Sequence, residues 1–277
     1  MDVTLLGTGC PLPDPNRAGP ATLVRAGGHA LLFDAGRGVL MRLAGAGLPS
    51  PAFLSRLFLT HLHSDHITDV NDVITMRWAM SPTPNLLPVI GPPGTKAFID
   101  RTIDMLVADI GFRVAHHADL TWEPACEVHE LTEGVAWEAD GVRVVAAPTD
   151  HRPVSPTVGY RIEHDGAAVV IAGDTVPCDS LTRLCEGADV YVQTVIRTDL
   201  VRSVPSPRLH DILDYHSSVE DAGRTAAKAG VRTLVLTHPV PPPAPGTEDE
   251  WVALAAAHFD GEVVLAHDLM TVAALAR

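Results

Sequence analysis

Three histidines and one aspartate lie within six consecutive residues of the segment 60–66. In a strand, side chains two residues apart share a face, so His61 and His63 are expected to point the same way. An apolar run precedes the segment and a helical pattern follows it, so the turn into the helix should bring Asp65 and His66 toward the same space. Imidazole and carboxylate donors gathered at the C-terminal end of a strand predict a metal site.

His151 and Asp174 are two further candidate donors. Each follows a predicted strand, at 142–147 and 167–172. Taken alone, either residue would be an ordinary turn residue. Beside the first cluster they become candidate ligands, because a two-metal site needs more donors than one segment supplies.

Two more histidines lie at the ends of predicted elements. His216 precedes a predicted helix at 219–229, where backbone N–H groups and the helix dipole attract anions. The alternative is a capping serine with an incidental histidine beside it. His238 follows a predicted strand at 233–236, and the alternative there is a surface histidine at a strand end. The adjacent pair His116 and His117 is interpreted as surface or loop residues.

The elements that must position these residues alternate irregularly, with hairpins in both halves of the chain. Such a pattern predicts an α/β (α+β) protein in which helices cover two packed sheets. Strands are predicted at 3–6, 21–25, 30–33, 87–90, 127–131, 142–147, 158–164, 167–172, 190–192, 233–236 and 262–266. Helices are predicted at 39–43, 67–80, 95–110, 180–185, 219–229 and 248–258.

Composition indicates a globular protein with a sizeable core. Of the 277 residues 46% are hydrophobic but only 5% are aromatic, so the core should consist mainly of aliphatic side chains. No repeat or change of composition indicates a second domain, and residues 1–277 are predicted to form a single domain. The four cysteines form no CxxC pair, and neither a leader nor a membrane-length apolar run is visible, so a cytoplasmic protein is expected.

The formal net charge of −14 bears on the substrate. Non-specific binding of nucleic acid depends on lysine and arginine neutralising phosphates, which this charge opposes. A phosphate at the active site remains compatible with it, because two divalent cations would dominate the local field. The composition favours a small-molecule or short phosphodiester substrate over a long polyanion.

The segment 60–66 resembles the HxHxDH signature of the metallo-β-lactamase superfamily, and the whole chain most resembles its ribonuclease Z-like branch. The resemblance implies the four-layer αββα sandwich of that superfamily. It also implies a ligand set in which His61, His63 and His151 hold one metal, Asp65, His66 and His238 hold the second, and Asp174 bridges the two. Asp34 would not bind a metal itself but would hold a ligand in place, a role compatible with capping the helix that follows it.

The resemblance implies two divalent ions, best suited to Zn²⁺, with Mn²⁺ or Fe as alternatives. Such a pair lowers the pKa of bound water to about 7 and so supplies a hydroxide nucleophile. Residues 215–218 resemble the family's His-Ser-Thr element, and His216 would donate a hydrogen bond to the leaving oxygen. Asp65 and His216 are therefore the candidate catalytic residues of a metal-dependent hydrolase acting on ester bonds, a ribonuclease Z-like phosphodiesterase.

The chain departs from the family pattern at two places. Ribonucleases Z that process tRNA carry a long arm between the third histidine and the bridging aspartate, whereas here a tight hairpin joins His151 to Asp174. The family's His-Glu-Ala-Thr element, whose glutamate orients a catalytic histidine, reads Gln193-Thr194-Val195-Ile196. Both departures count against tRNA as substrate unless a partner subunit supplies the arm. Dimers are common in this branch, although no periodicity of the chain requires a homodimer.

The expected substrate is a small, cyclic or RNA 3′-end phosphodiester. One alternative keeps the enzyme and changes the bond to a lactone, thioester or sulfate ester, because the same hydroxide attacks carbonyls. Another alternative is a metal-stabilised binding or regulatory module without catalysis. A purely structural zinc is normally closed by four protein ligands, which argues against that module.

Overall fold

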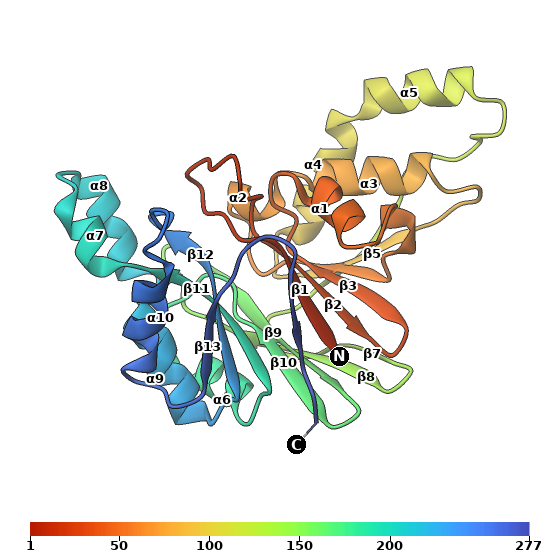
Figure 1. The fold of residues 1–277 in the computed structure, drawn as a ribbon. Coiled ribbons are helices and arrows are strands. Elements are labelled where there is room, and N and C mark those ends of the chain that lie inside the picture. Colours follow the sequence, from red (N-terminus) through yellow and green to blue (C-terminus); the bar gives the residue numbers. More distant parts are fainter. Residues whose placement is uncertain (277) are drawn as a thin grey trace.

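The computed structural model describes residues 1–276, and these form two seven-stranded β-sheets packed face to face (Figure 1). Strands β1 to β6 and the last strand, β14, make the first sheet in the order β14-β1-β2-β3-β4-β5-β6. Their bounds are β1 Asp2–Gly7, β2 Ala21–Ala26, β3 His29–Phe33, β4 Arg56–Phe58, β5 Leu87–Gly91, β6 Cys126–Glu130 and β14 Met270–Ala273.

The second sheet has the order β13-β12-β11-β10-β9-β8-β7. In both sheets, antiparallel hairpins adjoin parallel crossovers: β8, β9 and β10 pair antiparallel, whereas β10 to β13 pair parallel. The bounds are β7 Gly134–Ala139, β8 Val142–Pro148, β9 Val158–His164, β10 Ala167–Ile171, β11 Val190–Ile196, β12 Thr233–Val240 and β13 Glu262–Leu265.

A mostly aliphatic core fills the space between the sheets, as the low aromatic content requires. Its centre is aromatic: Phe33 stacks on Phe58 with ring centroids 4.7 Å apart, and Tyr160 packs against the edge of that pair. The Tyr160 hydroxyl donates to the Leu59 carbonyl oxygen over 2.8 Å, so the one polar group of this cluster is satisfied. This contact ties the second sheet to the segment that follows β4.

Helices cover the outer face of each sheet, which makes four layers (Figure 1). Helices α1 (Val39–Gly45), α3 (Val70–Ala79) and α4 (Thr95–Met105) bury aliphatic side chains against the first sheet. Helices α6 (Asp179–Cys185), α9 (Val219–Ala229) and α10 (Glu248–Ala256) do so against the second. The predicted αββα sandwich is confirmed.

Several predicted element boundaries are wrong. The single helix predicted at 67–80 is two helices, α2 (Ser64–Ile67) and α3, and that predicted at 95–110 is α4 followed by α5 (Val107–His116). Residues 59–63 lie in a loop beyond β4 rather than in a strand. The prediction also lacked six elements: β7, β14, the 3₁₀-helix η1 (Pro51–Phe53), α7 (Thr198–Ser203), α8 (Pro207–His210) and the 3₁₀-helix η2 (Asp211–Asp214).

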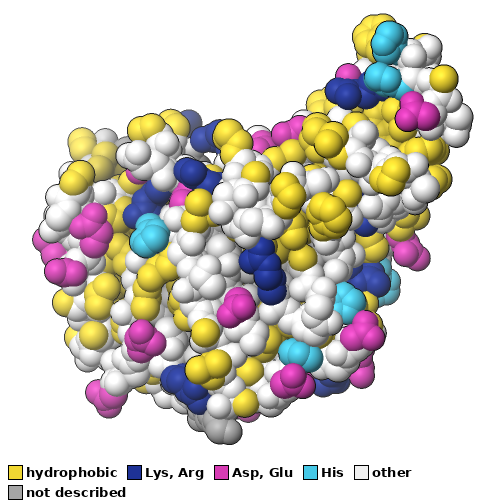
Figure 2. Space-filling view, turned by 45° about the vertical axis from the view of Figure 1, so that its right-hand side comes forward, with side chains coloured by type: hydrophobic (Ala, Val, Ile, Leu, Met, Phe, Trp, Pro, Cys, Tyr) yellow, Lys and Arg dark blue, Asp and Glu magenta, His cyan; other side chains and the backbone are white. Residues whose placement is uncertain are grey.

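Helix α5 projects from the body of the molecule beside α3 and α4 (Figure 1). Only one side of it is covered, where Ile110 packs with Trp78 and Leu120. Apolar side chains are exposed on this projection, and Figure 2 shows them as part of the surface at its upper right. Within residues 1–276, no helix combines the length and apolar character needed to cross a bilayer.

Candidate metal centre

The seven predicted ligands converge at one end of the two sheets, on loops and strand ends separated by up to 177 residues of sequence. His61 and His63 lie in the loop after β4, and Asp65 and His66 lie in the first turn of α2. His151 follows β8, Asp174 follows β10, and His238 lies within β12. Two groups result, in each of which the donor atoms lie within 4.8 Å of one another: His61, His63, His151 and Asp174, and Asp65, His66 and His238.

Three imidazole nitrogens meet in the first group. His63 Nδ1 lies 3.1 Å from His61 Nε2 and 3.2 Å from His151 Nε2. Ligands about 2.05 Å from a tetrahedral zinc are about 3.3 Å from each other, so these separations suit one shared ion. The premise that His61 and His63 share a strand face was wrong, yet the loop brings their nitrogens together as expected.

The second group joins α2 to β12. His238 Nε2 lies 3.1 Å from Asp65 Oδ2, and His66 Nε2 lies 3.7 Å from the same oxygen. His238 has a positive φ of 51°, a conformation that is unusual for a non-glycine residue. Its backbone N–H donates to the Thr8 carbonyl oxygen over 3.1 Å, which holds this strained residue against the end of β1.

Asp174 lies between the two groups. Its Oδ2 atom is 3.8 Å from His151 Nε2 and 3.5 Å from His66 Nε2, one histidine from each group. The His66 Nε2 and Asp174 Oδ1 atoms are buried without a hydrogen-bond partner among the described residues. Unsatisfied buried atoms are costly unless a ligand completes them, so the donor set fits a pair of divalent ions with Asp174 between them.

Backbone and carboxylate partners fix the orientation of the ligand histidines. Asp34 Oδ2 accepts from His66 Nδ1 and from Thr60 Oγ1, each over 2.8 Å, and Asp34 Oδ1 accepts from the Thr60 N–H. His151 Nδ1 donates to the Tyr215 carbonyl oxygen over 2.7 Å. Both rings therefore present Nε2 to the centre. Asp34 does not cap α1, since the N-cap residue is Gly38.

For three of the donors, His61, His151 and Asp174, the pKa shift favours the protonation state that binds a metal. Burial lowers the pKa of His61 well below its usual value and lowers the pKa of His151 to about 4. Burial would raise the pKa of Asp174, but the imidazoles of His238 and His66 hold that pKa well below its ordinary range. Neutral imidazoles and an ionised carboxylate are the ligand forms of these side chains.

His216 lies beside the centre and outside both donor groups. Its Nε2 is 3.3 Å from Asp174 Oδ2, and its Nδ1 donates to the Ile212 carbonyl oxygen over 2.9 Å. Thr194, which stands where the family has its glutamate, instead donates to the Gly173 carbonyl oxygen over 3.0 Å. A backbone carbonyl of η2 thus orients His216, and sequence patterns carry no signal for such a partner.

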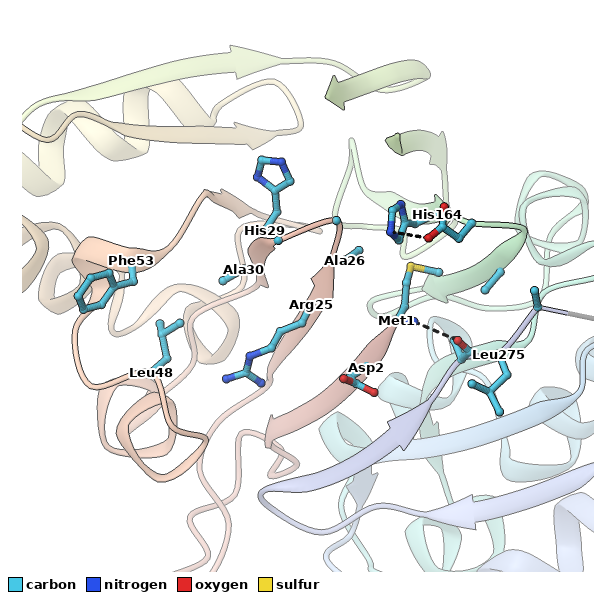
Figure 3. A pocket seen from close by; sticks show the side chains of 16 residues that line it. Met1, Asp2, Arg25, Ala26, His29, Ala30, Leu48, Phe53, His164 and Leu275 are labelled. Carbon is cyan, nitrogen blue, oxygen red and sulfur yellow. Dashed lines mark hydrogen bonds and ion pairs between the residues drawn. The ribbon is translucent and has the colours of Figure 1, made fainter. Parts of the chain in front are cut away.

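A surface hollow of about 720 Å³, shown in Figure 3, lies at the end of the sheets away from the donor groups. It is lined by the starts of β1 and β3 and by the turn after β9, and it contains His29 and His164. Each of these histidines has an acidic partner of its own, Asp140 at 2.8 Å and Asp165 at 3.2 Å. They do not converge on one another as the ligand histidines do. His116 and His117 are exposed at the end of α5, as predicted.

The fold and the paired donor groups define a metallo-hydrolase of the β-lactamase type. The family model described as "Beta-lactamase superfamily domain" matches residues 29–239. A protein named Ribonuclease Z from Mycobacterium bovis is 57% identical over 273 residues, covering 97% of this chain and 96% of that protein. The Ribonuclease Z of Mycolicibacterium paratuberculosis is 58% identical over 271 residues, with the same coverage. The chain therefore belongs to the β-lactamase superfamily and, within it, to the ribonuclease Z family.

Solved structures agree with the fold. The metallo-β-lactamase fold protein YhfI from Bacillus subtilis superimposes with a TM-score of 0.75 at 24% identity, covering 98% of both chains. The short form of human tRNase Z gives a TM-score of 0.73 at 24% identity, covering 99% of both chains. The predicted family, fold class and function class, a metal-dependent hydrolase of the ribonuclease Z type, are confirmed.

Proposed function

We propose that this enzyme is a two-zinc phosphodiesterase that cleaves the 3′ extension of precursor tRNA. The convergence of the two donor groups around Asp174 carries the proposal, because this arrangement presents two adjacent divalent sites to one substrate phosphate. In this proposal His61, His63 and His151 hold one ion, Asp65, His66 and His238 hold the other, and Asp174 bridges them.

Zinc suits this donor set best, since imidazole nitrogen and carboxylate oxygen are its usual ligands besides thiolate. When bound, the two ions would supply an activated water and neutralise charge on the phosphoryl oxygens. The Cys10 thiol belongs to neither donor group, so the proposal includes no thiolate ligand.

The chain's own residues orient the substrate and move a proton. His63 is the partly exposed member of its donor group, so the centre opens to solvent on that side. His216 carries its proton on Nδ1 toward Ile212, which leaves Nε2 facing the centre. Asp174 and the Ile212 carbonyl favour the protonated ring and, against the effect of burial, raise the pKa of His216. His216 can then donate from Nε2 to the leaving oxygen.

The relatives support RNA as the substrate despite the tight hairpin between His151 and Asp174. Proteins named Ribonuclease Z match 97% of this chain over 96% of their own length, which leaves no room in them for a long extra arm. A short chain of this kind is therefore compatible with the activity in their name. The charge of −14 then predicts that affinity for RNA depends on the centre and its rim more than on general attraction to phosphate.

The test combines metal analysis with turnover. Protein stripped with a chelator and reloaded with zinc, manganese or iron is assayed on a precursor tRNA with a 3′ extension, with mature tRNA as the control. Bis-p-nitrophenyl phosphate, p-nitrophenyl sulfate and a lactone form the second panel. Zinc-dependent cleavage of the precursor together with the phosphodiester is expected. Turnover of the sulfate or the lactone alone would replace this function with the alternative ester hydrolase.

We also propose that the enzyme works as a homodimer through the projection formed by α4 and α5. Phe112, Val107 and Met105 are 74%, 69% and 67% exposed there, and apolar side chains exposed together are typical of an interaction surface. A groove of about 320 Å³ between α2 and α4 adjoins Met105, so a second copy would find both a protruding apolar helix and a recess.

Light scattering on eluted protein tests the dimer. Wild-type protein is expected at twice the chain mass, and Phe112→Glu is expected at a lower average mass. Met41→Glu is the matched control, because Met41 is 75% exposed on α1, away from the projection. A monomeric wild type, or a Phe112→Glu variant that remains dimeric, contradicts this interface.

We further propose that residues 1–277 act as one domain in the cytoplasm. The match over 97% of this chain and 96% of a relative's length supports a single domain. The four cysteines carry free thiols, as a reducing compartment requires. Limited proteolysis that releases a stable fragment would contradict the first part, and fractionation of cells tests the second.

A further inference from the structure

Tyr215 stands at the metal centre although neither the motif nor the ligand set includes it. Its ring centroid lies 5.1 Å from that of His151 and 4.8 Å from that of His216. The chain has three tyrosines, and the other two, Tyr160 and Tyr191, are fully buried with their hydroxyls hydrogen-bonded. Tyr215 is partly exposed, and its hydroxyl has no hydrogen-bond partner among residues 1–276.

The position of Tyr215 is tied to the ligand histidines through its backbone. The Tyr215 carbonyl oxygen accepts from His151 Nδ1 over 2.7 Å, and the next residue, His216, is held by the Ile212 carbonyl. The 3₁₀-helix η2, which precedes Tyr215, packs Ile212 and Leu213 into a small apolar cluster with β11 and β12. The backbone at Tyr215 therefore keeps a fixed place relative to the centre, which favours a substrate-contacting role for its side chain.

The hydroxyl of Tyr215 is a hydrogen-bond donor at neutral pH. A phenol keeps its proton at neutral pH, so this hydroxyl can donate. The ring contacts with His151 and His216 place the side chain beside the centre. When a phosphodiester is bound at the centre, its phosphoryl oxygens are suitable acceptors for this hydroxyl.

We infer that the Tyr215 hydroxyl donates a hydrogen bond to a non-bridging phosphoryl oxygen of the substrate. This inference rests on the proposed function, because it requires a phosphodiester at the centre. Negative charge grows on the non-bridging oxygens as the nucleophile approaches, so a fixed donor there stabilises the transition state more than the ground state. Tyr215 would thus act beside His216, which faces the leaving oxygen.

The test is Tyr215→Phe, which removes the hydroxyl and keeps the ring, in zinc-loaded enzyme with bis-p-nitrophenyl phosphate. A hydrogen bond to a charged group contributes enough to lower kcat/KM by about 10- to 100-fold when it is lost. The loss should fall mainly on kcat, with metal content and thermal midpoint unchanged. Tyr191→Phe is the matched control, since it removes a phenol hydroxyl from the core away from the centre and should leave kcat unchanged.

Inorganic phosphate provides a second measurement that needs no turnover. Titration calorimetry should show phosphate binding to the zinc-loaded Tyr215→Phe variant about 10-fold more weakly than to wild type. Unchanged phosphate affinity or unchanged kcat/KM in Tyr215→Phe would overturn the inference, and loss of metal would make Tyr215 a structural residue. A wild type that binds phosphate but hydrolyses no phosphodiester would refute the proposed function instead.

Discussion

His66 Nδ1 donates to the Asp34 carboxylate over 2.8 Å, although 32 residues separate the two in sequence. Asp34 follows β3 in a left-handed conformation with φ 58°, and from there it also holds both polar groups of Thr60. One carboxylate therefore fixes a ligand of the second donor group and the residue that precedes the first. The two donor groups are therefore positioned by the same residue, Asp34.

Asp34→Asn should weaken metal binding about 10- to 100-fold, because the loss of an outer carboxylate makes a ligand histidine less basic and less well oriented. Asparagine tolerates a positive φ, so the backbone should be retained. Asp140→Asn is the matched control: Asp140 also has a positive φ and accepts from a histidine, His29, over 2.8 Å, at the far end of the sheets. Competition with a chelator measures the metal affinity of both variants. Equal metal affinity in Asp34→Asn and Asp140→Asn would contradict a supporting role for Asp34.

Replacing one donor from the three-histidine group should remove one ion. His63→Ala leaves His61 and His151 without their shared neighbour, so about one divalent ion per chain and no turnover are expected. Asp174→Ala should retain less than one ion, because Asp174 faces both groups. Elemental analysis with circular dichroism tests this. Two ions per chain in either folded variant would refute the ligand assignment.

His216→Ala should separate catalysis from metal binding. Since His216 lies outside both donor groups, metal content should equal that of wild type. The kcat should fall about 10²- to 10⁴-fold, the usual contribution of a positioned general acid. His258→Ala, on the outer surface at the end of α10, serves as the control. A His216→Ala variant that loses metal would show that His216 is a ligand.

The packing around the centre also limits which substitutions are tolerated at Gly173, the residue before Asp174. Gly173 has φ 67°, and a Cβ there would lie 2.7 Å from Thr60 Cβ. Gly187 has a similar φ of 63° with nothing within 4 Å of the same position. Gly187→Ala should cost only the left-handed backbone, about 1–2 kcal/mol. Gly173→Ala adds a steric clash to that backbone cost, so its total loss in the free energy of unfolding should be about 2–5 kcal/mol. Urea denaturation compares the two, and equal losses would contradict the crowding argument.

The convergence of the candidate ligands could be predicted from sequence, because residue types and spacing that suit a metal ion form a recognisable pattern. His61, His63, Asp65 and His66 form one short motif, and the more distant donors follow strands. The groups that orient these side chains by hydrogen bonds were harder to predict. Asp34 was named only through the family resemblance, and the carbonyl oxygens of Ile212 and Tyr215 could not be predicted, because every residue has a carbonyl and only the fold selects two of them.

Tertiary contacts also explain the wrong element boundaries. The predicted helix at 67–80 is interrupted at Asp69, whose carboxylate accepts from the Gly38 N–H over 2.5 Å and whose own N–H donates to the Ala35 carbonyl. The short strand β14 forms because Asp2 pairs with Ala273 across the two ends of the chain. Such long-range pairing leaves no local pattern, whereas the amphipathic, capped helix α9 was predicted with its observed bounds.

Acid should destabilise the metal-free protein through the buried ligand histidines. The pKa of His151 is about 4 in the folded protein, against an unperturbed value of about 6.5. Between these values the unfolded chain binds more protons than the folded one, so the free energy of unfolding falls as pH falls. His151 alone should account for a loss of about 2 kcal/mol between pH 7 and pH 5.

His151→Gln isolates this contribution from that of His66. Asp174 and Asp34 raise the pKa of His66 against the effect of burial, so the contribution of His66 to stability has the opposite pH dependence. Urea denaturation of chelator-treated protein at pH 7 and pH 5 should show a smaller loss of stability in the variant than in wild type. The glutamine has no proton to gain, so the difference between the two losses measures the depressed pKa directly. Identical losses would mean that His151 titrates normally in the folded protein, and its ring would then not be held neutral and ready for a metal at mildly acidic pH.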